Sequence, residues 1–177
     1  MRQLEVFCIM DRRKKQVKER IMDAMIALSA RKSWDKITIT DIIEESKVAR
    51  ATFYRNFNGI DDLVEYGIEQ FRIRYWADAP QDGTEFLRPE MIEYTFAFYY
   101  QNRDLILSFY HSGLSTTVLD IITESMILSF GDMPSDSIER YRLYYCSGAL
   151  YNTMIHWLET GAKETPAQMA EAFLNFS

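Results

Sequence analysis

The sequence predicts an all-α protein with a small N-terminal head and a larger helical body. Apolar residues recur three or four positions apart along most of the chain, as they do on the buried face of an amphipathic helix. No segment alternates between apolar and polar residues as a strand would, and no Asn-Gly turn joins two such segments. Hydrophobic residues make up 47% of the 177 residues, which is enough to build a sizeable core.

The charge is unevenly distributed along the chain. Residues 1–56 hold 13 Lys and Arg against 8 Asp and Glu, whereas residues 57–177 hold 7 against 18. The first part therefore carries a net charge of +5 and the second −11, a pattern typical of a basic module attached to an acidic body. Because charges are screened over about 8–10 Å at ordinary salt, the acidic body does not prevent the basic part from binding a polyanion.

The N-terminus and the overall hydropathy argue against membrane insertion and secretion. No run of about 18 or more uncharged apolar residues is present, so we expect no membrane span. The first residues contain a short apolar patch but no small-residue cleavage site, unlike a signal peptide. We expect the nine residues ahead of Met10 to form a loose extension, and both Met1 and Met10 stay open as the natural start.

The residues that enzymes and metal sites need are not grouped. Cys8 and Cys146 are far apart and lack metal-ligand spacing, which indicates reduced thiols in a cytoplasmic protein. His111 and His156 are isolated, so we expect no metal site and no cofactor. Since neither a nucleophile–base constellation nor a glycine-rich phosphate loop is present, the sequence does not favour an enzyme.

Three helices are expected in the head. Apolar residues at helical spacing predict an amphipathic helix over about 13–31, and Thr38 with Asp41 fits a capping box that begins a short helix over about 39–46. A turn at Ser46-Lys47 leads to a third helix, from 49 or 50 to 56. Two short helices joined by a tight turn have helix-turn-helix spacing.

A linking helix and five further helices are expected in the body. Asp61 and Asp62 favour the first turn of a long helix over about 60–77, because its dipole attracts negative charge there. Gly113, Gly131 with Pro134, and Gly161 separate the later helices, and Thr165-Pro166 supplies an N-cap and a proline at N1 for the last one. These helices are expected over about 85–101, 103–112, 115–130, 135–160 and 165–175. We assign residues 10–58 to the head and 59–177 to the body.

The helix-turn-helix segment carries candidate DNA-contacting side chains. Such a motif lodges its second helix in the major groove, where base edges can be distinguished. The N-terminus of its first helix meets phosphate through free N–H groups. Hydroxyls at that N-terminus and polar or basic groups on the second helix therefore form the candidate set, which comprises Thr38, Thr40, Arg50, Thr52, Tyr54, Arg55 and Asn56.

The segment "ITITDIIEESKVARATFYRNFNGIDDL" closely resembles the signature of the TetR family of transcriptional regulators. That signature runs roughly T-V-x-D-I-A, G-V-S-x-G-T-L-Y-x-H-F and x-S-K-E-E-L, and the resemblance covers about residues 13–65. It implies that Thr52 and Tyr54 contact DNA and that Phe53 packs inside. The sequence departs from the pattern at Ala51, Asn56 and Ile60, where the family usually has glycine, histidine and a phosphate-contacting lysine.

The resemblance also implies a helical C-terminal domain that binds an effector and forms a homodimer. The stretches "YTFAFYYQNRDLILSFYHSG" and "RYRLYYCSGALYNTM" suggest an aromatic pocket wall, although ordinary core packing is the alternative; the candidates are Phe98, Phe109, Tyr110, Tyr144, Tyr151 and Met154. The last two helices usually pack against their mates in such dimers. The candidates for that interface are Gly148, Tyr151, Asn152, Ile155, Ala170 and Leu174.

The function implied is that of a sequence-specific regulator of transcription. The expected protein is a homodimeric repressor that binds a palindromic double-stranded operator and is released by a small-molecule effector of unknown identity. The acidic body argues against a strongly anionic effector. The alternative is a DNA-binding regulator controlled by a partner protein.

Overall fold

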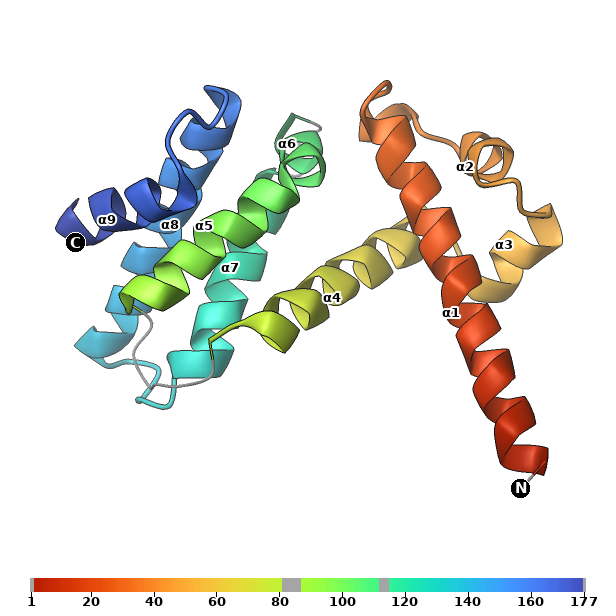
Figure 1. Ribbon diagram of the computed structural model, residues 1–177, viewed down its shortest axis with the longest axis horizontal. Helices are drawn as coiled ribbons and strands as arrows, with labels where there is room; N and C mark the ends of the chain where they lie inside the picture. The colour runs from red at the N-terminus through yellow and green to blue at the C-terminus, as the bar shows by residue number, and fades with distance from the viewer. Residues whose placement is uncertain (1, 81–86, 112–114, 177) are drawn as a thin grey trace. The chain divides into compact units, whose positions relative to one another are not determined.

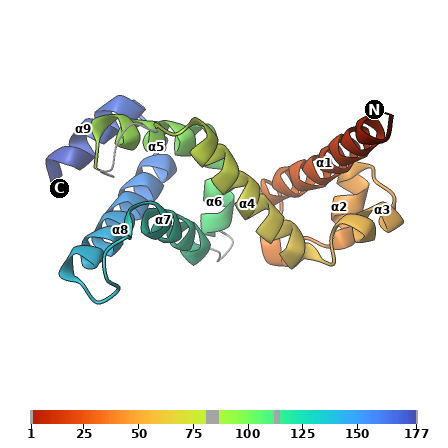
Figure 2. The same cartoon turned by 90° about the horizontal axis from the view of Figure 1, so that it is seen from below.

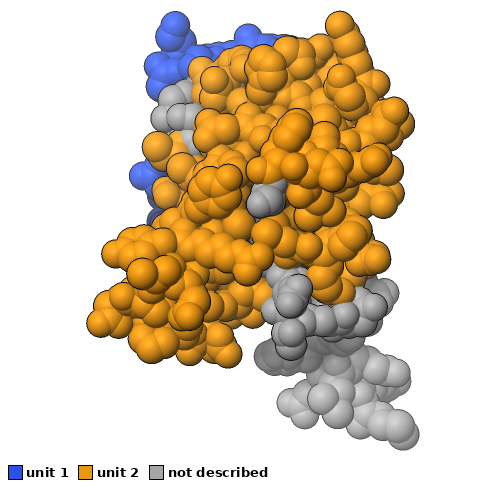
Figure 3. Space-filling model, turned by 90° about the vertical axis from the view of Figure 1, so that its left-hand side faces the viewer, with its two compact units in different colours: residues 1–70 blue, residues 71–177 orange. Residues whose placement is uncertain are grey.

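The computed structural model describes residues 2–80, 87–111 and 115–176, and every regular element in these ranges is a helix (Figure 1). The prediction of an all-α fold is therefore confirmed. The helices form two compact units, residues 1–70 and residues 71–177, which are coloured separately in Figure 3. The division falls within the fourth helix, after Gln70, whereas the sequence predicts a boundary ahead of that helix.

Unit 1 contains the expected helix-turn-helix. The first helix begins at Arg2 and not near residue 13, because no glycine or proline interrupts the chain between Arg2 and Ser29. The expectation of a loose extension ahead of Met10 is therefore wrong. The elements of the unit are α1 (Arg2–Ser29), the 3-10 turn η1 (Trp34–Lys36), α2 (Ile39–Ser46), α3 (Arg50–Asn56) and the first part of α4 (Ile60–Asp78).

The core of unit 1 is built around two phenylalanine rings. Phe53 on α3 is fully buried, Phe57 directly after α3 is 1% exposed, and their ring centroids lie 6.0 Å apart. Since α3 has only seven residues, it is too short to be stable alone in water. Burial of each ring contributes roughly 1.5–3 kcal/mol and holds α3 against the unit. The other fully buried apolar side chains of the unit are Ile21, Met25, Ile42 and Leu63.

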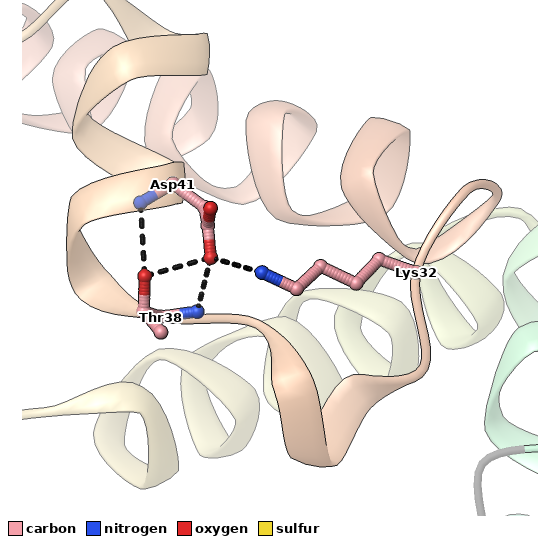
Figure 4. Close-up of polar contacts among 3 residues, drawn as sticks. All are labelled: Lys32, Thr38 and Asp41. Atoms are coloured by element: carbon pink, nitrogen blue, oxygen red, sulfur yellow. Dashed lines mark hydrogen bonds and ion pairs between the residues drawn. The ribbon is translucent and has the colours of Figure 1, made fainter.

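Asp41 joins the start of α2 to the end of α1 (Figure 4). Its Oδ2 accepts hydrogen bonds from Thr38 N at 2.7 Å, from Thr38 Oγ1 at 2.7 Å and from Lys32 Nζ at 2.6 Å. Asp41 N donates to Thr38 Oγ1 at 3.2 Å, which completes the predicted capping box. The Lys32 ammonium, followed by the Thr38 donors, holds the pKa of the Asp41 carboxyl well below its usual range.

A left-handed residue makes the turn between α2 and α3. Lys47 has φ 55° and ψ 32° and ends α2 at the predicted Ser46-Lys47 turn. Val48, which follows it, is 6% exposed and anchors the corner in the core. The turn therefore sets the angle at which α3 leaves α2.

Unit 2 contains the rest of α4, with α5 packed against α9 and α7 against α8 (Figure 1 and Figure 2). Phe96 on α5 makes edge contacts with Trp157 on α8 and Phe173 on α9, with centroid distances of 5.6 Å and 6.2 Å. These aromatic contacts tie α5, α8 and α9 into one core. The helices are α5 (Pro89–Gln101), α6 (Arg103–His111), α7 (Ser115–Phe130), α8 (Ile138–Glu159) and α9 (Pro166–Phe176).

Two of these helices begin later than the sequence predicts. Pro89 is at the start of α5 and Arg88 is extended with φ −89° and ψ 140°, so residues 87 and 88 precede the helix. Ser137 caps α8, since its side chain accepts a hydrogen bond from Arg140 N at 3.3 Å. The expected helical positions 85, 86 and 112 and the separator Gly113 lie outside the described residues.

We expect Asp41→Asn to lower the melting temperature, because it removes the negative charge that Lys32 and Thr38 stabilise. The folded-state pKa of Asp41 is lowered, so the contribution of its charge is complete above the unfolded pKa of about 3.9. It is lost as the pH falls from there through the folded pKa. The difference in melting temperature between Asp41→Asn and the wild type should therefore be constant from pH 7 to about pH 4 and shrink as the pH falls to 2.5, without vanishing, because the folded pKa lies lower still.

Glu44→Gln is the matched control, since it removes a carboxylate from the exposed side of α2. An Asp41→Asn melting temperature equal to that of Glu44→Gln at pH 7 would contradict the stabilising role of the carboxylate. A difference from the wild type that stays constant down to the most acidic pH would contradict its ionisation as the cause.

Candidate nucleic-acid interface

One face of α3 is exposed while the opposite face is fixed in the core. Phe53 points into unit 1 and is fully buried, whereas Arg50, Ala51 and Arg55 are exposed and Tyr54 is 47% exposed. Residues 50, 51, 54 and 55 share a face because positions four apart lie one above the other on a helix. This face is the polar and basic surface that α3 can offer to a ligand.

Arg50 and Tyr54 form a pair on this face. The guanidinium carbon of Arg50 lies 5.6 Å from the centroid of the Tyr54 ring, and its Nη2 donates to the tyrosine hydroxyl at 3.5 Å. The Tyr54 ring in turn meets the buried Phe53 ring edge-on at a centroid distance of 5.5 Å. The pair is thus positioned by the core, and the remaining guanidinium N–H groups are available as donors.

Thr52 and Asn56 are half-buried at the edge of the exposed face. Asn56 Nδ2 donates to the backbone carbonyl of Thr52 at 2.8 Å, so one of its amide N–H groups is already used within α3. The second amide N–H and the Thr52 hydroxyl have no hydrogen-bond partner in the part of the chain that the structure describes. Arg55 is exposed and likewise makes no ion pair with any described residue.

The hydroxyls of the two threonines at the N-terminus of α2 differ in whether they are free to bind a ligand. The Thr38 hydroxyl is engaged in the capping box as both donor and acceptor. The Thr40 side chain is exposed, and none of the described side chains or backbone groups bonds to its hydroxyl. The backbone N–H groups of residues 39 and 40 belong to the first turn of α2, where helices leave donors free for an anion.

Unit 2 contains a cavity that includes the C-terminal part of α4. The space between the atoms of its wall totals about 390 Å³, a figure that includes the solvent-open mouth, so the enclosed space is much smaller. Its wall is mainly aromatic and aliphatic, with a few polar groups. The lining residues are Phe71, Arg72, Tyr75, Trp76, Thr95, Tyr99, Ile121, Ile122, Ser125, Met126, Phe130 and Leu150.

A buried hydroxyl pair provides part of the polar surface of this wall, which also includes Arg72 and Ser125. Thr95 Oγ1 donates to the carbonyl of Met91 at 2.7 Å, so its only proton is used there. The Tyr75 hydroxyl, 2.8 Å from Thr95 Oγ1, is therefore the donor of that bond and its oxygen can still accept another. Burial raises the pKa of Tyr75 above its usual value, so the hydroxyl stays neutral.

The six residues named from the sequence as pocket candidates do not line this cavity. Phe98 packs behind its wall, with ring centroids 5.0 Å from Phe71 and 5.2 Å from Tyr75. Phe109 and Met154 are buried, Tyr144 is 48% exposed, and Tyr110 and Tyr151 are half-buried. The wall residues on α4 were missed because the sequence pattern of that helix indicates only a link.

The six candidate interface residues are also divided by the structure. Gly148 has open space beyond its Cα and Asn152 is exposed, whereas Ile155 and Ala170 are each 4% exposed and pack inside unit 2. Tyr151 and Leu174 are half-buried. Three further residues on the same face of α8 as Gly148 are exposed: Ile138, Tyr141 and Tyr145, at 86%, 66% and 63%.

The described residues offer neither a membrane span nor a metal centre. No helix among them is long and apolar enough to cross a membrane. No group of three or more His, Cys, Asp or Glu side chains within residues 2–80, 87–111 and 115–176 is arranged to hold a metal ion.

Solved structures with the same fold are described as regulators. A TetR transcriptional regulator from Streptococcus agalactiae 2603V is 19% identical, with 96% of this chain and 97% of that chain covered and a TM-score of 0.65. A TetR-family transcriptional regulator from Syntrophomonas wolfei strain Goettingen is 20% identical, with 92% and 93% covered and a TM-score of 0.64. The dihydroxyacetone kinase operon activator DhaS is 14% identical, with 90% and 93% covered and a TM-score of 0.64. At these identities the likeness concerns the fold alone.

Two family models match most of the chain. Residues 21–66 match the model described as bacterial regulatory proteins, tetR family, and residues 89–177 match the model described as transcriptional regulator C-terminal region. Comparison with curated protein sequences gives no match. The chain therefore belongs to the TetR family of transcriptional regulators, which are DNA-binding proteins and not enzymes.

Proposed function

We propose that the protein is a sequence-specific repressor that binds a palindromic operator as a homodimer and is released by a small-molecule effector. The observation that carries the proposal is the exposed pair of Arg50 and Tyr54, which the buried Phe53 positions on the outer face of α3. A short helix that is fixed from behind and presents basic and hydroxyl groups in front suits entry into a major groove.

The exposed groups on α3 suit different parts of a DNA duplex. The planar guanidinium of Arg50 matches the O6 and N7 acceptors of guanine, and the exposed methyl group of Ala51 suits contact with a thymine methyl. The hydroxyls of Tyr54 and Thr40 and the guanidinium of Arg55 suit phosphate oxygens. In this assignment Arg50 and Ala51 read sequence, while the other three residues position the head.

The cavity in unit 2 is the proposed effector site. Its aromatic wall favours an apolar or aromatic compound, and the free acceptor position on the Tyr75 hydroxyl favours a ligand with one hydrogen-bond donor. Phe71, Tyr75 and Trp76 belong to α4, whose N-terminal part lies in the head. A ligand that shifts these side chains therefore acts on the same helix that begins in the DNA-binding unit, and this is the proposed route of release.

The exposed face of α8 is the proposed dimer contact. Ile138, Tyr141, Tyr145, Gly148 and Asn152 follow one another at alternating intervals of three and four, the spacing of a helix–helix seam. Gly148 has no side chain to keep a second helix away. Pairing through α8 would bring two heads together, which must lie about 34–36 Å apart to enter successive major grooves.

We expect the protein to bind a duplex from the region flanking its own gene, with an affinity that falls as salt rises. Arg50→Lys keeps the charge but removes the bidentate fork, so it should lose about 1–3 kcal/mol of preference for the correct base with little change in salt dependence. Tyr54→Phe should weaken binding to all duplexes alike, because a phosphate contact carries no sequence information. Fluorescence anisotropy on a set of singly mutated duplexes measures both effects.

Lys163→Gln, an exposed change on unit 2, is the control for general charge effects. An Arg50→Lys protein with the same base preferences as the wild type would remove Arg50 from the set of sequence-reading residues. If the wild type binds no duplex at low salt, the assignment of α3 to DNA is wrong.

Ser125→Leu should fill the cavity, because this side chain lines it on α7. The variant is expected to bind the neutral apolar dye Nile red several-fold more weakly than the wild type, and compounds that release the wild type from DNA should no longer release it. Ser129→Leu is the matched control, since it makes the same change on the exposed side of α7.

Equal dye binding and equal release for Ser125→Leu and the wild type would exclude this cavity as the effector site. In that case a protein that co-purifies in stoichiometric amount with the repressor would favour control by a partner protein.

The sign of regulation is tested separately by deleting the gene, because a similar fold serves DhaS, an operon activator. Increased transcription of the neighbouring genes supports repression, and decreased transcription contradicts it.

The double variant Tyr141→Glu, Tyr145→Glu should be monomeric, because it places four carboxylates in a symmetric α8 contact. Sedimentation velocity should show half the mass of the wild type, and affinity for a palindromic duplex should fall at least tenfold. Ile73→Glu, a change at a 51% exposed apolar residue on α4, should stay dimeric. A dimeric double variant would place the interface elsewhere.

A further inference from the structure

We propose that α1 is a second DNA-contacting element, in which Lys14 and Lys18 bind backbone phosphates that flank the segment read by α3. The proposal rests on the DNA-binding function proposed above and extends it to a helix outside the helix-turn-helix. The ligand of these lysines is identified by its charge. It is the same DNA duplex that α3 is proposed to bind.

Lys18 has an unusual position in unit 1. Its ammonium lies 5.0 Å from the centroid of the Phe57 ring and 4.7 Å from that of Tyr66. Phe57 ends α3 and is only two residues from the exposed Arg55. The two rings therefore hold a cation beside the end of the recognition helix, and they leave its N–H groups free to donate to an anion.

Lys14 extends this charge along α1. It lies one helical turn before Lys18 on the same face, and both are on the face that carries Ile21 and Met25 further along the helix. The packing face of α1 thus changes from apolar to cationic where the helix continues past the head core. Figure 1 shows the N-terminal turns of α1 extending beyond α3.

The cations of this part of α1 are poorly compensated. Residues 12–20 contain six Lys and Arg and a single acidic residue, Glu19. Glu19 pairs with Lys15 at 3.9 Å, whereas Lys14 makes no ion pair with any residue in the described ranges. Like charges one turn apart repel each other. A polyanionic ligand relieves this repulsion.

The test compares phosphate contacts by salt dependence on duplexes of two lengths. Binding of the full-length protein is measured by anisotropy between about 50 and 300 mM NaCl, on the operator duplex and on one trimmed at both ends to the segment covered by α3. Lys14→Gln and Lys18→Met are each expected to lower the slope of log affinity against log salt by about 0.9 for every phosphate that is no longer neutralised. Trimming the duplex should lower the wild-type slope by more than either single variant does. It should leave the slope of the double variant Lys14→Gln, Lys18→Met unchanged, because that variant makes neither flanking contact.

Two substitutions serve as controls with the same change of charge. Arg20→Gln alters an exposed cation on the opposite side of α1, and Arg74→Gln alters one on α4 in unit 2. Both should keep the wild-type slope. Lys18→Arg should also keep the wild-type slope, because it keeps the charge. Lys14 is exposed, so replacing Lys14 tests the proposal without disturbing the core.

The proposal would be overturned if Lys14→Gln and Lys18→Met had the same salt slope as the wild type on the longer duplex. It would also be overturned if Arg20→Gln lowered the slope as much as these two variants do. Weaker binding of the two variants to vesicles containing phosphatidylserine, with DNA slopes unchanged, would overturn it in favour of a lipid surface. Failure of the proposed function looks different, because the wild type itself would then show no salt-dependent duplex binding.

Discussion

The burial of Phe53 and Phe57 is the interaction on which the candidate DNA-binding surface depends. The helices that carry the motif have only eight and seven residues, so neither is stable without tertiary contacts. Phe53 holds α3 from behind and also meets the Tyr54 ring, which in turn carries the Arg50 guanidinium. The orientation of the outward pair is therefore a consequence of core packing, and Phe57 extends the same support to Lys18 on α1.

The fourth helix combines two roles that constrain each other. Near its middle, Gly67 lies so close to α1 that an added Cβ would be 2.5 Å from Met22 Cε. Further along, Phe71 and Tyr75 form part of the cavity wall in unit 2. In the proposed mechanism a ligand at the cavity wall acts on the same helix that contacts Met22 in unit 1. This is why the proposal gives α4, as well as α3, a part in regulation.

Local features of the chain were more predictable than the positions of its side chains. The capping box of Thr38 and Asp41 and the Ser46-Lys47 turn could be predicted, because they depend on neighbours in sequence. The pocket candidates on α5, α6 and α8 were named because their stretches are rich in aromatic residues and methionine. Phe98 packs behind the cavity wall and Tyr144 is 48% exposed, since the position of a side chain depends on which neighbouring helix covers it. The start of α1 was also misjudged, because the helix runs from Arg2 through the residues expected to form a loose extension.

By itself the sequence determined the class of fold, the helix-turn-helix and the outward position of Arg50, Tyr54 and Arg55 on α3. These follow from helical periodicity, local capping and the alternation of Phe53 with polar neighbours, all of which act within a few residues. Only the tertiary structure decided that Lys32 completes the Asp41 network, that Tyr75 and Thr95 share a cavity wall, and that Lys18 lies on two rings. Each of these contacts joins residues from different elements, and their meeting depends on how the helices pack, which no local pattern encodes.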